Sequence, residues 1–254
     1  MKPYTLRNTD IHTGNLILVN PKYQYQEPGK KQMVTVTEQA SHVQMDRQAA
    51  ILLSELMQKI HGWSKIVPVS GWRSLQEQQG IWNDTLAESG TEFTKKFVAV
   101  PGHSEHQTGL AIDLGLKKDT IDFICPEFPY SGICQVFRRN APSYGFVERY
   151  PSGKETITGI GHEPWHFRYV GVPHSFIMEE NDLTLEEYID FIRDYPYQSR
   201  PYHYQNNRLN VTVSYLKAAQ DGSIPTALDT NLPYSISGNN IDGFIITEWR
   251  GTNG

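Results

Sequence analysis

The sequence predicts an α+β fold, with helices packed on an antiparallel sheet and a small all-β region at the C-terminal end. Apolar residues recur at three- and four-residue steps over 45–60, which indicates an amphipathic helix. Residues 109–116 instead alternate between large apolar and small or polar side chains, which is typical of a strand. After Pro196 helix formers become scarce, and short strand-like runs follow between Gly, Pro and Asn turns. This change predicts two domains, residues 1–197 and residues 198–254.

The first half of the larger domain is expected to hold two strands and two helices. In chain order we expect a strand at 14–19, a turn at Pro28-Gly29, the helix at 45–60, a strand at 66–70, and a helix from Ser74 to about Gly90. Glu77 stands three residues after Ser74, which together predict a capping box at a helix start. Gly62 stands where a glycine would end the first helix.

The second half of this domain is expected to be less regular. In order, we expect a loop at 98–108, the strand at 109–116, an irregular segment at 117–134, a short helix at 134–141, strands beginning at Gly145 and His166, and a helix at 185–195. The smaller domain carries strand-like runs at 211–213 and 243–247. We expect it to support the larger domain, with partner binding or self-association as alternatives.

Composition and charge exclude two classes of function. The 254 residues carry 23 Lys and Arg against 28 Asp and Glu, a net charge of −5, so we expect no nucleic-acid partner. The aliphatic run at 16–19 is far shorter than the ~20 residues that cross a bilayer, so we expect no membrane span. Residues 1–10 contain no apolar signal-peptide core, which predicts a cytoplasmic protein. Cys125 and Cys134 are too few for a disulfide scaffold and are expected to be reduced.

Metal-ligand residue types gather in two places in the sequence. Asp113 lies in the alternating strand, on the face opposite its large apolar residues, and a buried carboxylate there needs a cation. With His106 before this strand and His166 opening a later one, two imidazoles and a carboxylate could form a catalytic zinc site. Glu163 could then take a proton from water at the metal. Alternatively, both histidines make ordinary hydrogen bonds and Asp113 caps a turn.

Three motifs in order resemble one family. They are Ser-x-His-x2-Gly-x-Ala-x-Asp at 104–113, Glu-Pro-Trp-His-Phe-Arg-Tyr-Val-Gly at 163–171, and Ser70-Gly71-Trp72-Arg73-Ser74 with Gln78. Over about residues 14–172 the chain resembles the zinc D,D-peptidases of the VanY/VanX group. Because it starts without a membrane anchor, it is most similar to the bifunctional VanXY type. The resemblance implies hydrolysis of D-Ala-D-Ala and removal of terminal D-Ala from peptidoglycan precursors, which gives vancomycin resistance.

The resemblance also assigns roles to residues. It implies Zn²⁺ bound by His106, Asp113 and His166. Glu163 then becomes the general base, which later protonates the leaving amine. Arg73 becomes the group that polarises the scissile carbonyl and stabilises the oxyanion, a task that suits its planar, permanently charged fork.

Further residues are candidates for substrate binding in this implied site. Gln78 is expected to face the cleft, Ser104 to donate to the substrate carboxylate, and Trp165 to form a wall or to pack in the core. His103 could reach the site but is expected to be a loop residue. His162 could orient Glu163, yet it matches no ligand position of the family. The irregular segment at 117–134 is expected to border the cleft as a lid that limits substrate length.

The implied partner is a small peptide or peptidoglycan precursor that ends in D-Ala-D-Ala. One alternative is a peptidoglycan L,D-carboxypeptidase or endopeptidase on the same fold, although the chain shows no export signal. Another is a binding module that keeps zinc without catalysis, and the presence of Glu163 and Arg73 argues against it. The sequence predicts neither the balance of the two activities nor the oligomeric state.

Overall fold

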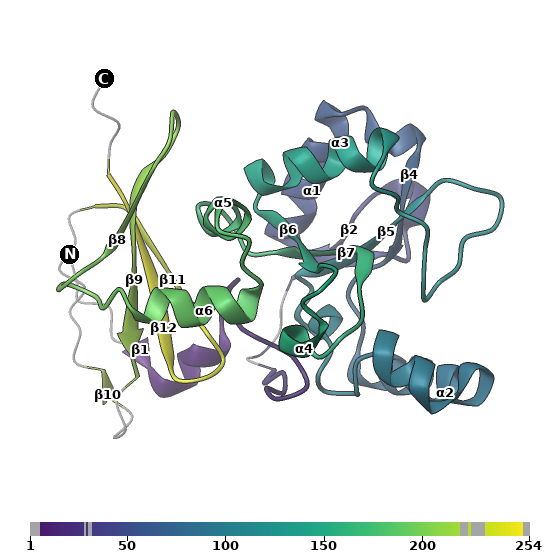
Figure 1. Cartoon of the computed structure of the whole chain (residues 1–254), viewed down its shortest axis with the longest axis horizontal. Coiled ribbons are helices and arrows are strands. Elements are labelled where there is room, and N and C mark those ends of the chain that lie inside the picture. The colour runs from purple at the N-terminus through teal and green to yellow at the C-terminus, as the bar shows by residue number, and fades with distance from the viewer. Residues whose placement is uncertain (1–5, 28, 30–31, 219–222, 225–231, 251–254) are drawn as a thin grey trace. The chain divides into compact units, whose positions relative to one another are not determined.

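The alternating stretch around Asp113 lies at the centre of a four-stranded antiparallel sheet (Figure 1). The computed structural model describes residues 6–27, 29, 32–218, 223–224 and 232–250. The strand order is β4 (Ile66–Ser70), β5 (Ala111–Leu116), β7 (Glu163–Tyr169) and β6 (Phe146–Tyr150). The predicted α+β fold with an antiparallel sheet is therefore confirmed.

Contacts divide the chain into two units. The larger unit comprises Val19–Tyr25 and Gly29–Thr184, and the smaller comprises Met1–Leu18, Gln26–Pro28 and Leu185–Gly254. N-terminal residues thus pack with the C-terminal strands. The boundary between residues 197 and 198 stays a prediction.

The apolar face of the sheet forms the core of the larger unit. Two helices cover it, α1 (Arg47–Lys59) and α3 (Gly132–Asn140), and Figure 1 shows them together on one side of the sheet. Leu110, Ile112 and Leu114 point into this core and are at most 2% exposed. The predicted alternation is confirmed, and it turns Asp113 toward the opposite face.

Helix α2 (Leu75–Phe97) begins where the capping box predicts. The Ser74 hydroxyl accepts from the Glu77 amide at 3.1 Å, and the Glu77 carboxylate accepts from the Ser74 amide at 2.7 Å. The helix was predicted to end near Gly90, and Gly90 does interrupt it with φ 78°. Helical turns then resume up to Phe97, and this second part was not predicted.

The remaining elements of the larger unit are short. They are β2 (Met33–Thr35), β3 (Gln44–Asp46), α4 (Glu155–Thr158), α5 (His174–Glu180), and the 3-10 helices η2 (Glu38–Ala40), η3 (Gly62–Ser64), η4 (Glu105–Thr108) and η5 (Ala141–Tyr144). Both cysteines are free, as expected.

The smaller unit contains a second antiparallel sheet, in the order β11 (Tyr234–Gly238), β12 (Gly243–Trp249), β9 (Asn210–Lys217) and β8 (Tyr202–Gln205). It also holds β1 (Leu6–Arg7) paired with β10 (Ser223–Ile224), η1 (Asn8–His12) and α6 (Leu185–Arg193). The turn between β11 and β12 is closed by Asn239, whose side-chain oxygen accepts from three following backbone amides. The prediction of an all-β C-terminal region is confirmed.

Several local predictions were wrong. Residues 14–19 form no strand, although 16–19 are buried, because Leu16 donates to the Ser237 hydroxyl and Leu18 to the Asn239 carbonyl instead of to a ladder. His61, with φ 53°, takes the left-handed position after α1 that was expected of Gly62. Strand β7 begins at Glu163, three residues before the predicted start. The Pro28 part of the predicted turn lies outside the described residues.

Candidate active site

The pairing of β5 with β7 brings together residues that are 53 positions apart in the sequence. Asp113 stands directly opposite His166 in the register, and Ser70 of β4 stands opposite Asp113 on its other side. His106 lies in η4, immediately before β5. These positions place one carboxylate between two imidazoles on the face of the sheet away from the core.

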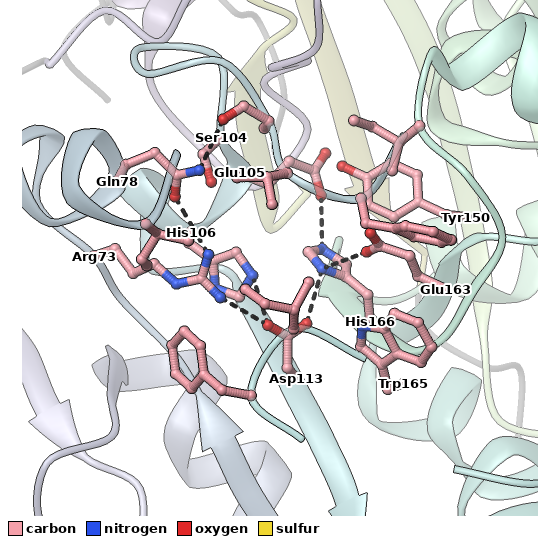
Figure 2. Close-up of a pocket in the computed structure, with 17 residues that line it drawn as sticks. Arg73, Gln78, Ser104, Glu105, His106, Asp113, Tyr150, Glu163, Trp165 and His166 are labelled. Atoms are coloured by element: carbon pink, nitrogen blue, oxygen red, sulfur yellow. Dashed lines mark hydrogen bonds and ion pairs between the residues drawn. The ribbon is translucent and has the colours of Figure 1, made fainter. Parts of the chain in front are cut away.

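The three side chains form a tight buried cluster (Figure 2). Asp113 Oδ2 lies 3.1 Å from His106 Nε2, and Asp113 Oδ1 lies 3.0 Å from His166 Nδ1. One ligand atom from each residue lies within 4.8 Å of the others, and all three residues are at most 4% exposed. Asp113 Oδ1 has no hydrogen-bond partner in the described part of the chain. Two imidazole nitrogens and a carboxylate, one of whose oxygens is buried without a hydrogen-bond partner, suit a bound cation.

The backbone fixes which nitrogen of His106 faces the cluster. His106 Nδ1 lies 2.6 Å from the Gly71 carbonyl oxygen, which can only accept, so Nδ1 carries the proton. The lone pair of Nε2 therefore points at the cluster, as a metal ligand requires. Burial lowers the pKa of His106 to about 4, and the charge of Arg73 acts in the same direction, so this ring is neutral.

The pKa values of the other two members of the cluster, Asp113 and His166, are shifted in opposite directions. Burial alone would raise the pKa of Asp113, but His106 and His166 beside it hold that pKa well below its ordinary value. Burial opposes the charged form of His166, yet the neighbouring carboxylates of Asp113, Glu105 and Glu163 raise its pKa to about 9. The Asp113 carboxylate thus lies between a neutral His106 ring and a His166 ring favoured in its charged form.

Glu163 opens β7 beside this cluster. Its carboxylate Oε2 lies 3.6 Å from His166 Nδ1, and the residue is 4% exposed. Burial raises the pKa of Glu163 to about 8, although the neighbouring His166 and Arg73 counteract part of this effect. A carboxylic group with such a pKa can accept and return a proton near neutral pH.

Arg73 lies on the other side of Asp113, just after β4. Its guanidinium donates to the Ser70 hydroxyl at 2.7 Å, to the Gln78 side-chain oxygen at 3.3 Å and to Asp113 Oδ2 at 2.9 Å. Gln78 is in turn fixed because its amide donates to the Ala99 carbonyl at 2.8 Å. Burial lowers the pKa of Arg73, while Asp113 works against that shift. The Arg73 guanidinium is therefore held in one orientation at the pocket.

The pocket around the cluster contains all eight residues that the sequence singled out. They are Arg73, Gln78, Ser104, His106, Asp113, Glu163, Trp165 and His166. Trp165 also packs in the core, where its ring lies 6.4 Å from that of Phe97. Phe123 and Ile124 show that the irregular segment does border the pocket.

Two of the pocket residues that sequence reasoning missed lie against His166. The ring of Tyr150 lies 4.8 Å from that of His166, and the Glu105 carboxylate Oε2 lies 3.6 Å from His166 Nε2. Only the position of Glu105 next to His106 could have drawn attention to it. His103 and His162 lie outside the cluster, as expected: His103 contacts the Asn20 carbonyl oxygen, and His162 stacks on Tyr130.

An antiparallel sheet with a buried His-Asp-His cluster, a carboxylic group and a fixed arginine has the composition of a metal-dependent peptidase site. Comparison with protein families agrees, because residues 42–172 match the family described as VanY: D-alanyl-D-alanine carboxypeptidase. The chain belongs to this family and is therefore a peptidase.

Individual relatives extend this similarity. The chain is 52% identical over 125 residues to the bifunctional D-Ala-D-Ala dipeptidase and D-Ala-D-Ala carboxypeptidase VanXYC of Enterococcus gallinarum, a match that covers 49% of this chain and 66% of that protein. The crystal structure of the vancomycin resistance D,D-dipeptidase VanXYg with a D-Ala-D-Ala phosphinate analogue superposes with a TM-score of 0.94, at 50% identity over 98% of this chain and 99% of that one. The crystal structure of a mutant of the vancomycin resistance D,D-pentapeptidase VanY with Zn(II) superposes with a TM-score of 0.56, at 28% identity. This match covers 69% of this chain and 98% of that one.

None of the helices in the described part of the chain is both long and apolar enough to cross a membrane.

Proposed function

We propose that this chain is a zinc-dependent D,D-dipeptidase and D,D-carboxypeptidase. It hydrolyses D-Ala-D-Ala and removes the terminal D-Ala of peptidoglycan pentapeptide precursors, and so contributes to vancomycin resistance. The observation that carries the proposal is the β5–β7 register, which sets Asp113 against His166 beside Glu163. The similarity to VanXYg over nearly the whole chain supports the substrate class. A cytoplasmic location remains a prediction of the sequence.

The donor set fits zinc better than a harder cation. Zinc favours four-coordinate sites, and catalytic sites use three protein ligands with one open position. His106 Nε2, Asp113 and His166 Nδ1 are the atoms that would hold it. The VanY mutant bound to Zn(II) supports this choice of metal. A zinc ion there would supply a Lewis acid for the scissile carbonyl.

The residues of the chain perform the proton and charge transfers in this proposal. Glu163 takes a proton from the attacking water and returns it to the amine of the departing D-Ala. Arg73, held by Ser70 and Gln78, donates to the oxygen that becomes negative in the tetrahedral state. Because its donors are positioned before substrate arrives, little reorganisation is needed.

The remaining pocket residues serve the substrate. Ser104 is 2% exposed and lines the pocket next to the ligand-bearing turn, so its hydroxyl is the proposed donor to the terminal carboxylate. Trp165 forms an apolar wall suited to a methyl side chain. Gln78 acts chiefly by orienting Arg73.

The direct test measures D-Ala release from the D-Ala-D-Ala dipeptide and from the muramyl pentapeptide, each with and without a zinc chelator. We expect chelator-sensitive release from both, and recovery after zinc is added back. Release from a single substrate would restrict the function to one activity. A tetrapeptide ending in an L,D bond is the third substrate. Cleavage of this tetrapeptide alone would replace the proposal with an L,D-carboxypeptidase.

A further inference from the structure

Three charged side chains are completely buried beside the cluster of His106, Asp113 and His166. Glu105 Oε1 accepts from Arg149 Nε at 2.8 Å and from Arg168 Nη1 at 2.7 Å, and all three side chains are 0% exposed. Burying such ions is costly, and well-packed apolar residues often give equal or greater stability. Stability alone therefore explains the trio poorly, and its neighbours have to be considered.

The two oxygens of Glu105 face different partners. Both arginines contact Oε1, whereas Oε2 lies 3.6 Å from His166 Nε2. Within the described residues, neither Oε2 nor Nε2 has a hydrogen-bond partner. Figure 2 shows Glu105 and Asp113 on opposite sides of the His166 ring. The free oxygen of Glu105 is thus directed at the nitrogen that does not face the cluster.

This arrangement selects one form of the His166 ring. A neutral imidazole carries its proton on one nitrogen only, and the nitrogen that binds a metal must be the bare one. A carboxylate at Nε2 retains the proton there, so the proton on Nδ1, which faces Asp113 Oδ1 3.0 Å away, is the one that a metal ion displaces. Arg149 and Arg168 both donate to Oε1 of Glu105, so this oxygen is held in place and Oε2 faces the ring.

The first histidine is oriented in another way. His106 Nδ1 meets a backbone carbonyl, that of Gly71, which no substitution of a side chain removes directly. The 3-10 helix η4 carries both Glu105, which faces His166, and His106. Thr108 Oγ1 stabilises this turn by donating to the Glu105 carbonyl oxygen at 2.6 Å.

We propose that Glu105 is a positioning residue that holds His166 in the tautomer and orientation needed to bind the metal, with Arg149 and Arg168 as its charge-balancing support. The proposal rests on the function proposed above only in that a zinc ion is bound at this cluster. It concerns metal binding, so it can be tested without measuring peptidase activity.

The test compares the zinc affinity of folded variants by competition with a chromogenic chelator. Glu105→Gln removes the charge at nearly the same shape, and Glu105→Asp keeps the charge for the arginines but withdraws it from His166 by one methylene. We expect both variants to bind zinc about 10–100-fold more weakly, the usual loss when such a supporting carboxylate is changed. The visible spectrum of the cobalt-substituted protein should change as well, because the ligand field depends on the ring orientation.

Arg149→Met is the matched control. It also breaks the buried trio, but it leaves Glu105 paired with Arg168 and still facing His166. We expect it to lower the thermal unfolding midpoint while zinc affinity stays within about threefold of the unmodified chain. If Glu105→Gln does not fold, Glu105→Asp decides the question.

Two results would overturn the proposal. One is unchanged zinc affinity and an unchanged cobalt spectrum in a folded Glu105 variant. The other is an equal loss of zinc affinity in Arg149→Met, which would show that the trio acts only through stability. An unmodified chain that binds zinc tightly but releases no D-Ala would refute the proposed function and leave this inference intact. A chain that binds no zinc would refute both.

Discussion

Arg138 Nη2 donates to the carbonyl oxygen of Pro164, the residue between Glu163 and Trp165. The same guanidinium donates to the carbonyls of Phe128 and Pro129, at the end of the irregular segment. Its Nε also lies 2.7 Å from a Glu148 carboxylate oxygen on β6. One side chain of α3 thus ties together the segment that borders the pocket, the start of β7 and β6.

Arg138→Met should therefore destabilise the fold strongly. Four acceptors lose a charged donor in a largely buried place, and we expect the free energy of unfolding to fall by about 2–4 kcal/mol. Urea denaturation measures the change. The neighbouring Arg139 is exposed, so Arg139→Met should shift stability by less than about 0.5 kcal/mol. Equal effects of the two substitutions would show that the shared contacts of Arg138 add nothing.

Glu163→Gln should separate catalysis from metal binding. The amide cannot accept the proton of the attacking water, so kcat for D-Ala-D-Ala should fall by about 10²–10⁴-fold. Zinc affinity should stay close to that of the unmodified chain, since the three expected ligand atoms are untouched. Steady-state kinetics and a zinc titration check the two halves. Turnover at the normal rate would refute the role of Glu163 as the base.

The sequence could predict the parts of this molecule that depend on local patterns. The alternation at 109–116 places Asp113 opposite the apolar face, and the structure agrees because one face of β5 is packed in the core. The capping box at Ser74 is equally local. The apolar run at 14–19 was misjudged because a buried irregular segment and a strand have the same composition.

The support of the site depends on contacts that no local pattern encodes. Glu105 reaches His166 across 61 positions, and Arg138 reaches Pro164 across 26. Both depend on the order of strands in the sheet. A polar residue next to an expected ligand in the sequence gives no indication of which side chain it faces, and so Glu105 passed unnoticed while the expected ligand residues did not.

His174 should make the stability of the larger unit depend on pH. The residue begins α5 and is 6% exposed, and burial lowers its pKa to about 3 from an ordinary 6.5. The unfolded chain therefore binds the proton more tightly than the folded one. The stabilising contribution of the neutral ring is complete above pH 6.5 and is lost as the pH falls toward 3.

The measurement compares unfolding free energies of the unmodified chain and His174→Gln between pH 7 and pH 4. The difference between them should change by up to about 1.4 kcal/mol per pH unit below 6.5, the value for one proton. His203→Gln, at an exposed position on β8, serves as the control and should run parallel to the unmodified chain. A difference that stays constant with pH for His174→Gln would contradict the prediction.

Phe123 should determine how efficiently the site hydrolyses a short substrate. Its ring lies 5.5 Å from the Arg73 guanidinium and lines the pocket, although it is 46% exposed. We expect a dipeptide to occupy only the inner pocket and to depend on this apolar cover, and a pentapeptide to extend past it. Phe123→Ala should therefore lower kcat/KM for D-Ala-D-Ala roughly tenfold more than for the muramyl pentapeptide. Val136→Ala, an exposed apolar residue on α3 that does not line this pocket, should leave the ratio unchanged. An unaltered ratio in Phe123→Ala would show that the irregular segment borders the pocket without limiting what enters it.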